Sequence, residues 1–204
     1  MKKRVVIAGG GTGGHLYPGI ALARALMRHD MDIEISFVGT RKGLEAKVLP
    51  REGFELKTIF SAGLTGKKKV AKWVSWFKLP IGTAQSMCFL IKKRPGLVVG
   101  VGGYASGPLV FSAWILRIPI LIHEQNSIPG MTNKFLGKIA DKIAVSFKES
   151  ATYFPKEKVE VTGNMIREEF CQPKDEVVTK TEGPFRVLVL GGSQGAHSIN
   201  MAMV

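Results

Sequence analysis

An apolar run followed by a glycine turn and the start of a helix occurs three times in this chain. The turns are Gly9–Gly14, Gly100–Gly103 and Gly191–Gly195, and the first follows the run Val5–Ala8. Glycine allows the tight turn, and a strand that is apolar throughout is typical of a sheet covered on both faces. The repeated unit therefore predicts an α/β fold: a Rossmann-like parallel sheet with helices on both faces.

The rest of the chain continues this alternation of strands and helices. Strands are predicted at 4–8, 32–40, 54–60, within 96–108, at 119–126 and at 158–164, and residues 134–147 read as a helix leading into a strand. Helices are predicted after the first glycine turn, at 44–53 with a break near Pro50, at 66–94 with an interruption at Pro80, and at 111–117.

A change of composition near residue 171 predicts a domain boundary. Residues 171–184 are polar and contain two prolines, and residues 185–200 then repeat the opening strand, glycine turn and helix start. We predict a first domain at 1–165, a linker at 166–184 and the start of a second domain at 185–204. Twenty residues cannot bury a core of their own, so the sequence is expected to be truncated.

The charge of the chain favours an anionic partner. Lys and Arg number 29 against 16 Asp and Glu, a formal net charge of +13. Nucleic acid, an anionic membrane and a polyphosphate substrate all fit this charge. Nucleic acid is disfavoured because no aromatic-basic platform or reading helix is evident. The apolar stretches 79–91 and 108–122 are shorter than the ~20 residues of a membrane span. The N-terminal apolar run is too short for a signal peptide. The two cysteines, Cys88 and Cys171, are interpreted as reduced thiols.

The first glycine turn matches the dinucleotide pattern G-x-G-x-x-G at Gly9, Gly11 and Gly14. An NAD site also needs an acidic residue at the end of the second strand, where this chain has Val38–Thr40. Glu34 lies at the start of that strand, so a dehydrogenase is disfavoured. The Asp-Met-Asp stretch at 30–32 also precedes the strand and reads as a turn, and no convincing metal motif predicts a metal cofactor.

Polar side chains gather where ligands of such sheets bind. His123, Glu124, Gln125 and Asn126 follow the apolar run 119–122, and the carboxyl ends of strands form the ligand edge. His15 follows the first glycine turn, and imidazole is suited to accept a proton near neutral pH. A helix-capping or phosphate-binding role for His15 is the alternative.

Five motifs together carry a family resemblance. GGGTGGHLYPGIALA, GVGGYASGP, HEQNSIPG, TGNMIREEF and GGSQGAHSIN occur in this order between residues 5 and 200. They resemble the motifs of the MurG family, bacterial N-acetylglucosaminyltransferases that convert lipid I to lipid II in peptidoglycan synthesis and cell-wall biogenesis. Met165 departs from the family, which commonly has proline there. The resemblance implies two facing Rossmann-like domains, the GT-B architecture, of which the first binds the acceptor.

The resemblance also implies roles for individual residues. His15 would be the base for the acceptor hydroxyl, and Glu124 a second acid/base or an orienter of His15. Residues implied for UDP-N-acetylglucosamine are Thr12, Gly13, Gly14, Asn126, Arg167 and Ser193, and those for the acceptor pyrophosphate are Gly11, Gly103, Tyr104 and Ser106. A structural turn is the alternative for Tyr104 and Ser106, and a surface ion pair with Glu168 or Glu169 is the alternative for Arg167.

Residues 66–80 predict a helix that lies on an anionic membrane surface. On a helical wheel Val70, Trp73, Val74 and Phe77 form one apolar stripe, and Trp76 falls off that stripe, beside Lys69 and Lys72. Lys69, Lys72, Trp73 and Trp76 are the predicted membrane contacts. The alternative is that Trp76 packs under a loop.

The function that the resemblance implies is an inverting, metal-independent transfer of N-acetylglucosamine from UDP-N-acetylglucosamine to a lipid-linked muramoyl pentapeptide, at the cytoplasmic face of the bacterial inner membrane. A sugar-nucleotide epimerase of the same architecture and a non-catalytic, membrane-docked module are the alternatives. The chain as it stands is expected to be inactive, because its donor domain consists of one strand and one glycine turn.

Overall fold

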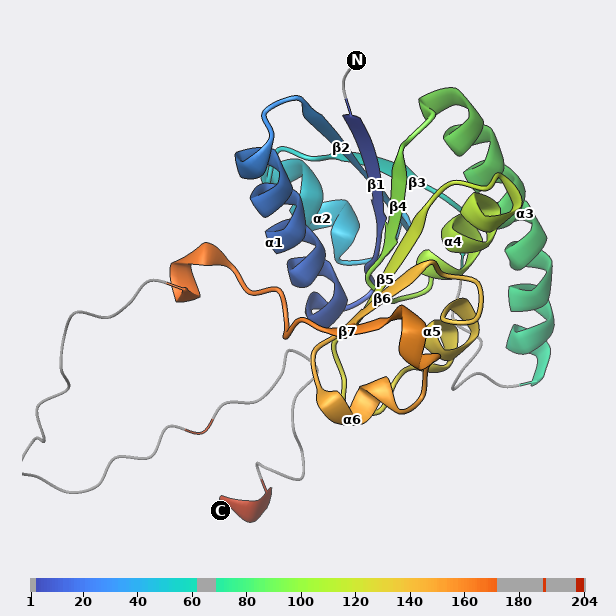
Figure 1. Ribbon diagram of the computed structural model, residues 1–204. Coiled ribbons are helices and arrows are strands. Elements are labelled where there is room, and N and C mark those ends of the chain that lie inside the picture. Colours follow the sequence, from blue (N-terminus) through green and yellow to red (C-terminus); the bar gives the residue numbers. More distant parts are fainter. Residues whose placement is uncertain (1–2, 62–68, 172–188, 190–200, 204) are drawn as a thin grey trace, which may run out of the picture. The chain divides into compact units, whose positions relative to one another are not determined.

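Seven parallel strands form one sheet in the order β3-β2-β1-β4-β5-β6-β7 (Figure 1). The computed structural model describes residues 3–61, 69–171, 189 and 201–203. The strands are β1 (Lys3–Ala8), β2 (Ile33–Gly39), β3 (Glu55–Thr58), β4 (Leu97–Gly100), β5 (Ile120–Glu124), β6 (Lys142–Val145) and β7 (Val159–Val161). Every pairing in the sheet is parallel, as the apolar strands predicted.

The helices cover both faces of this sheet (Figure 1). They are α1 (Gly13–His29), α2 (Glu45–Arg51), α3 (Lys69–Lys93), α4 (Ser106–Ile115), α5 (Met131–Leu136) and α6 (Lys148–Ala151), with 3-10 turns at Lys156–Lys158 and Glu168–Phe170. Helices α1 and α2 cover one face, and α3, α4 and α5 cover the other. The predicted Rossmann-like α/β fold is confirmed.

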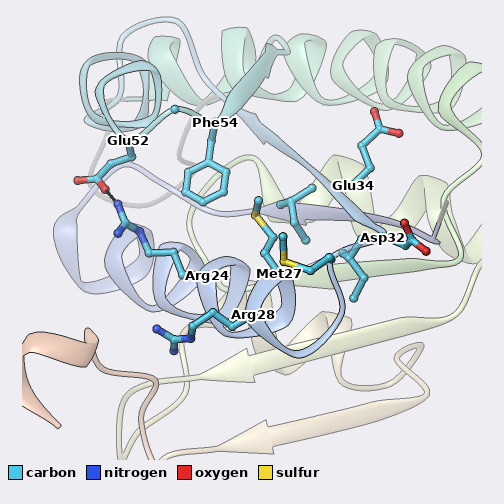
Figure 2. A pocket seen from close by; sticks show the side chains of 11 residues that line it. Arg24, Met27, Arg28, Asp32, Glu34, Glu52 and Phe54 are labelled. Atoms are coloured by element: carbon cyan, nitrogen blue, oxygen red, sulfur yellow. Dashed lines mark hydrogen bonds and ion pairs between the residues drawn. The ribbon is translucent and has the colours of Figure 1, made fainter. Parts of the chain in front are cut away.

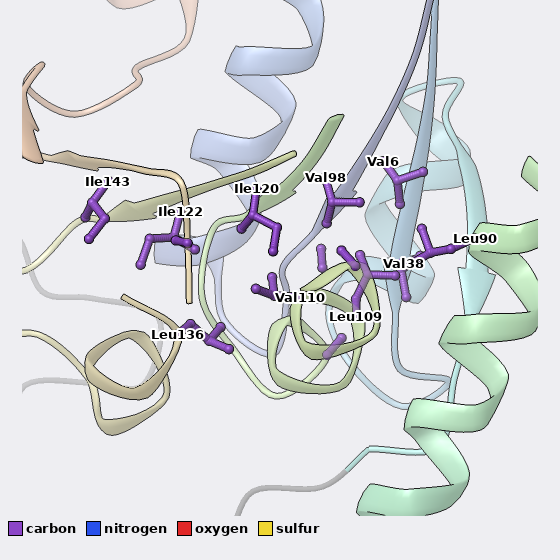
Figure 3. Close-up of a cluster of buried hydrophobic side chains, with 14 of the residues drawn as sticks. Val6, Val38, Leu90, Val98, Leu109, Val110, Ile120, Ile122, Leu136 and Ile143 are labelled. Carbon is purple, nitrogen blue, oxygen red and sulfur yellow. The ribbon is translucent and has the colours of Figure 1, made fainter. Parts of the chain in front are cut away.

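Alternating side chains of the central strands build two separate core layers. Val5 and Ile7 of β1 pack with Leu16 and Ile20 of α1. Val6 and Ala8 face the opposite layer. Figure 3 shows that layer, to which β1, β2, β4, β5 and β6 contribute Val6, Val38, Val98, Ile120, Ile122 and Ile143 and the helices contribute Leu90, Leu109, Val110 and Leu136. Successive residues of a strand point to opposite faces, and a sheet covered on both sides needs apolar residues at both.

Two helix boundaries differ from the prediction. The prediction of an interruption at Pro80 is wrong, because α3 continues through this proline and is 25 residues long in all. A proline inside a helix removes one backbone hydrogen bond. The packing of α3 along α4 offsets this loss, and it includes a hydrogen bond that the Ser112 hydroxyl donates to Thr83 O at 3.0 Å. Helix α4 begins at Ser106, five residues earlier than predicted, so the second glycine turn leads directly into it.

Contacts within the chain divide it into residues 1–170 and 171–204. The third glycine turn with Ser193, and most of the predicted linker and second domain, lie outside the described residues. The boundaries predicted at 165 and 184 therefore stay predictions. No helix in the described ranges is long and apolar enough to cross a membrane.

Candidate functional site

The strand order reverses between β1 and β4, and the two glycine turns that follow these strands lie against each other. A Cβ on Gly103 would lie 3.1 Å from Gly10 N and closer still to Gly10 O, and Gly103 has a φ of +82°. A Cβ on Gly102 would lie 2.7 Å from His15 Nδ1. Side chains here would separate the turns, so the glycines bring His15 and both loops together at the usual ligand position of such sheets.

A buried carboxylate that the sequence prediction missed lies beneath the first glycine turn. Glu45, at the start of α2, is 1% exposed. Its Oε2 accepts the Gly11 N–H at 2.8 Å, and its Oε1 accepts the N–H and the hydroxyl of Thr40 at 2.7 and 2.8 Å. The Gly11 N–H, which was predicted to face pyrophosphate, is therefore already engaged. A signal was present in the sequence, because Glu45 follows β2 and lies two positions after Gly43. A side chain at position 43 would occupy the space of the Glu45 carboxylate.

Glu34, the acidic residue of β2, has a structural role away from this edge. It pairs with Arg4 at 3.2 Å and with Lys93 at 2.8 Å. The hydrogen bond from the Lys93 ammonium holds the pKa of the Glu34 carboxyl below its ordinary value. Glu34 stands opposite Arg4 near the start of β1, so it cannot reach a nucleotide at the carboxyl ends of the strands.

The N-termini of α1 and α4 provide donors for an anion. Thr12 precedes α1 in an extended conformation, and its side chain makes no capping hydrogen bond. The N–H groups of Gly13 and Gly14 have no partner within the part of the chain that the structure describes. Neither α1 nor α4 carries an acidic residue in its first turn. Both helix ends can therefore hold a phosphate through N–H groups and the helix dipole.

The predicted polar cluster at the end of β5 is divided between the two faces of the sheet. His123 and Gln125 lie on the face covered by α1, and Glu124 lies on the face covered by α5. This follows from the period of two in a strand. Gln125 Oε1 is 3.0 Å from His15 Nδ1, so Gln125 is the residue that contacts His15. The expectation that Glu124 orients His15 is wrong, because its side chain points to the other layer.

Glu124 instead fixes the loop that follows β5. It is 1% exposed, and its Oε1 accepts the Asn126 N–H at 2.9 Å and the Asn126 side-chain amide at 2.8 Å. Its Oε2 accepts from Asn133 Nδ2 at 2.9 Å and from the Gly130 N–H at 3.2 Å. Four donors satisfy this buried charge, and Asn126 is presented at the surface in a fixed orientation.

The residues predicted for the acceptor pyrophosphate have different surroundings. Ser106 is fully buried, and its Oγ lies 2.8 Å from both Ala8 O and Gly102 O. A hydroxyl held by two main-chain carbonyls inside the core does not face a ligand, so the prediction is wrong for the Ser106 side chain. Tyr104 is 49% exposed, and its carbonyl accepts the Ser61 hydroxyl at 2.5 Å.

Arg167 lies beside α1. Its guanidinium is 5.1 Å from the ring centre of Tyr17 and 5.0 Å from that of Phe170, and it pairs with Glu169 at 3.5 Å. The alternative ion pair is thus present, together with stacking on a residue two positions after His15. Met165 packs against the core layer of α1, so methionine fills the position where proline is common.

Some predicted residues cannot be placed. The side chains of Lys69, Lys72, Trp73 and Trp76 lie outside the described part, although their backbone belongs to α3. No group of three His, Cys, Asp or Glu suited to a metal occurs among the described residues. The stretch 30–32 forms the predicted turn, with Asp30 pairing with Lys3 at 2.8 Å and accepting the Asp32 N–H.

A hollow of about 520 Å³ lies at the opposite end of the sheet, beside the C-terminal end of α1 (Figure 2). Met27 and Phe54 contribute apolar surface to it, and an ion pair joins Arg24 and Glu52. None of the predicted site residues lines this hollow. The candidate site is therefore the edge formed by the glycine turns, His15 and the end of β5.

This domain is a doubly wound α/β domain of the Rossmann class. Its strand order, its paired glycine turns and the polar residues at the carboxyl ends of its strands place the ligand edge at the topological switch point. Residues 5–145 match the N-terminal domain of glycosyltransferase family 28. The chain belongs to this family.

Two kinds of similar protein agree with this assignment. The chain is 48% identical, over 98% of its length, to the UDP-N-acetylglucosamine–N-acetylmuramyl-(pentapeptide) pyrophosphoryl-undecaprenol N-acetylglucosamine transferase of Geobacter sulfurreducens, and 45% identical to that of Myxococcus xanthus. It covers 56% and 52% of these relatives, so it spans about half of their length. The crystal structure of Acinetobacter baumannii MurG matches 84% of the chain with a TM-score of 0.67 at 30% identity, and the chain covers 48% of it. The resemblance to MurG proteins is confirmed.

More distant structures share the fold alone. The UDP-GlcNAc 2-epimerase from Neisseria meningitidis matches 79% of the chain with a TM-score of 0.58 at 16% identity. This similarity confirms the α/β architecture and carries no argument about the reaction.

Proposed function

We propose that this chain provides the acceptor-binding half of an inverting glycosyltransferase that moves N-acetylglucosamine from UDP-N-acetylglucosamine to lipid I. The observation that supports it best is the position of His15. Its ring is held by Gln125 where the two glycine turns meet, next to the open N-terminus of α1. A potential base and two anion-binding helix ends thus occur together, as transfer between two diphosphate-linked sugars requires.

In this proposal His15 removes the proton of the acceptor hydroxyl as its oxygen attacks the anomeric carbon of the donor. The bond from that carbon to UDP breaks, and the electron pair leaves on the phosphate. A single displacement of this kind inverts the anomeric centre. The hydroxyl of Thr12, the N–H groups of Gly13 and Gly14, and the guanidinium of Arg167 stabilise the diphosphate charge without a metal.

Glu124 acts through Asn126 in this scheme. The hydrogen bonds from Asn126 to Glu124 leave its side-chain oxygen and one amide hydrogen for a sugar. These groups fit the hydroxyl and acetamido groups of N-acetylglucosamine. Ser193 is proposed to contact the donor phosphate, and the N-terminus of α4 with Gly103 and Tyr104 to face the acceptor pyrophosphate.

The lipid part of the acceptor requires the protein to work at a membrane surface. Exposed apolar side chains lie on α3 and on α4: Leu79, Ile81, Ile91, Phe111 and Trp114. The rings of Phe111 and Trp114 stack at 5.6 Å. The lysine-flanked Trp73 and Trp76 of the sequence are proposed to bind an anionic bilayer, with each nearby basic residue contributing about 1 kcal/mol.

Transfer is tested with UDP-N-acetylglucosamine and lipid I, using a chain extended to the length of its curated relatives. Product should form with the extended wild type and far more slowly with His15→Ala. His29→Ala is the matched control, because His29 is an exposed histidine at the other end of α1. Equal rates for wild type and both variants would refute His15 as the base. Conversion of UDP-N-acetylglucosamine without any acceptor would instead support the epimerase alternative.

Membrane binding is tested separately by sedimentation with anionic and neutral vesicles. Binding to anionic vesicles should fall sharply with salt and decrease when Lys67, Lys68 and Lys69 are replaced by serine. Equal binding to both vesicle types would refute an electrostatic contact.

A further inference from the structure

The side-chain amide of Gln125 lies at the centre of a hydrogen-bond chain that joins the two site histidines. Gln125 is 9% exposed. Its Nε2 donates to Val101 O at 2.8 Å and lies 3.0 Å from His123 Nδ1, and its Oε1 lies 3.0 Å from His15 Nδ1. A carbonyl oxygen can only accept, so the bond to Val101 O fixes which end of the amide is the NH₂ group. The amide oxygen must therefore face His15.

This orientation assigns the protons of both rings. An amide oxygen only accepts, so His15 Nδ1 must carry a hydrogen, and the neutral ring then has its lone pair on Nε2. The second amide hydrogen points at His123 Nδ1, which accepts it. The proton of His123 is then on Nε2, which lies 3.3 Å from Gly163 O, a second obligatory acceptor. Burial lowers the pKa of His123, in agreement with a neutral ring.

The lone pair of His15 faces away from the core. Its Nε2 has no partner among the described residues, and it is not one of their buried unpaired polar atoms, which are Asn133 Oδ1 and Ser146 Oγ. Gly102 lies close to the Nδ1–Cε1 edge of the ring, where a Cβ would come within 2.7 Å of Nδ1. The nitrogen able to accept a proton is thus the one that substrate can reach.

The geometry points to Gln125 as a positioning residue that holds His15 in the Nδ1–H tautomer, so that Nε2 receives the proton of the acceptor hydroxyl. This inference rests on the proposed function. In the transfer step the hydroxyl proton moves to Nε2, the new carbon–oxygen bond forms, and the bond to UDP breaks with its electron pair on the phosphate. The Nδ1 hydrogen stays on His15 and remains hydrogen-bonded to the Gln125 oxygen. A neutral amide cannot take that proton onward, so Gln125 acts by orientation alone.

The tautomer can be measured without substrate. The two forms of a neutral imidazole are distinguished by long-range ¹H–¹⁵N correlation NMR on the labelled 204-residue chain, at about pH 8 where histidine is neutral. The His15 signals are assigned, among the four histidines, by their loss in His15→Asn. We expect hydrogen on Nδ1 in the wild type, whereas a free imidazole side chain favours Nε2. Hydrogen on Nε2 of His15 in the wild type would overturn the inference.

Three variants separate tautomer control from simple support of the fold. Gln125→Met keeps the size but not the acceptor, so His15 should revert to the Nε2–H form. Gln125→Glu keeps an oxygen acceptor for His15 while losing the donor to Val101 O, so the Nδ1–H form should remain. Gln85→Met is the matched control, because Gln85 is a half-buried glutamine whose Oε1 accepts the Phe60 N–H elsewhere. An unchanged His15 tautomer in Gln125→Met would overturn the inference.

Kinetics on the extended chain then distinguish this inference from the proposed function. Gln125→Met should lower kcat about 10- to 100-fold with little change in the KM for UDP-N-acetylglucosamine, because orientation of the base matters during the chemical step. A rise in KM with unchanged kcat would overturn the positioning role. Absence of transfer by the extended wild type would refute the proposed function, while the NMR result would still decide the tautomer.

Discussion

Replacing Glu45 with glutamine should destabilise the protein through the first glycine turn. The carboxylate accepts three hydrogen bonds, from Gly11 N–H and from the N–H and hydroxyl of Thr40, at 2.7–2.8 Å. Glutamine has the same shape but only one acceptor oxygen. If that oxygen stays with Thr40, the new NH₂ group faces the Gly11 N–H, and two donors oppose each other.

The expected loss follows from these contacts. One hydrogen bond to a charged group contributes about 1.5–3 kcal/mol, and the two bonds to Thr40 become weaker when the acceptor is neutral. Removing a buried charge offsets part of this cost. We expect the free energy of unfolding to fall by about 2–3 kcal/mol.

Urea unfolding of the 204-residue chain measures this change, and hydrogen exchange at the Gly11 amide should become faster. The matched control is Thr40→Val, which removes only the hydroxyl donor and should cost about 0.5–1.5 kcal/mol. A Glu45→Gln loss no larger than that of Thr40→Val would refute the reasoning, because it would mean that the Gly11 contact contributes nothing.

Four further outcomes are expected. In the extended chain His15→Ala should lower kcat by about 10²–10⁴ with little change in donor KM, and a change in KM alone would make His15 a binding residue. Arg167→Ala should weaken binding of UDP-N-acetylglucosamine, and Arg167→Lys should restore only part, since lysine lacks the planar fork; full recovery in a titration would contradict this. Burial lowers the pKa of His123, so below about pH 6.5 the unfolded chain binds a proton that the folded chain does not. The free energy of unfolding should therefore decrease as the pH is lowered. An equal pH dependence of this free energy in His123→Asn would exclude His123 as the cause. Arg117 has a φ of 55° and ends α4 in a Schellman motif, so Arg117→Gly should raise the unfolding free energy by about 1 kcal/mol while Arg117→Ala should not.

The strands were predictable from sequence because their signal is local. Val5–Ala8 is apolar at every position, which indicates a strand with both faces buried, and β2 and β4 each carry an apolar pair before a terminal glycine. Helix α4 was predicted too short because its first turn, Ser106–Pro108, reads as the end of a loop. Its start depends on the Ser106 hydroxyl reaching Ala8 O, which is 98 positions distant in sequence.

The arrangement of the site depended on which face each side chain takes. The end of β5 was recognised as polar, yet His15 was paired with Glu124 rather than with Gln125. Strand alternation separates these neighbours, but the choice between them requires knowing that α1 covers the same face as Gln125. Glu45 was missed for a similar reason, because its burial arises only when α2 packs beneath the first glycine turn.

The two core layers have a consequence for how sequences of this fold can diverge. Neighbouring residues of β1 face different helices, so a change of volume at Ile7 is absorbed against α1 and one at Val6 against α4. Mutations at positions of opposite layers that are distant and share no contacts should have additive effects, so each layer can change in sequence separately. The same division continues past the end of β5, where Glu124 belongs to the layer of α5 and Gln125, the next residue, to the layer of α1. The contact that orients His15 and the contacts that fix Asn126 can therefore change independently during evolution, although they come from neighbouring residues.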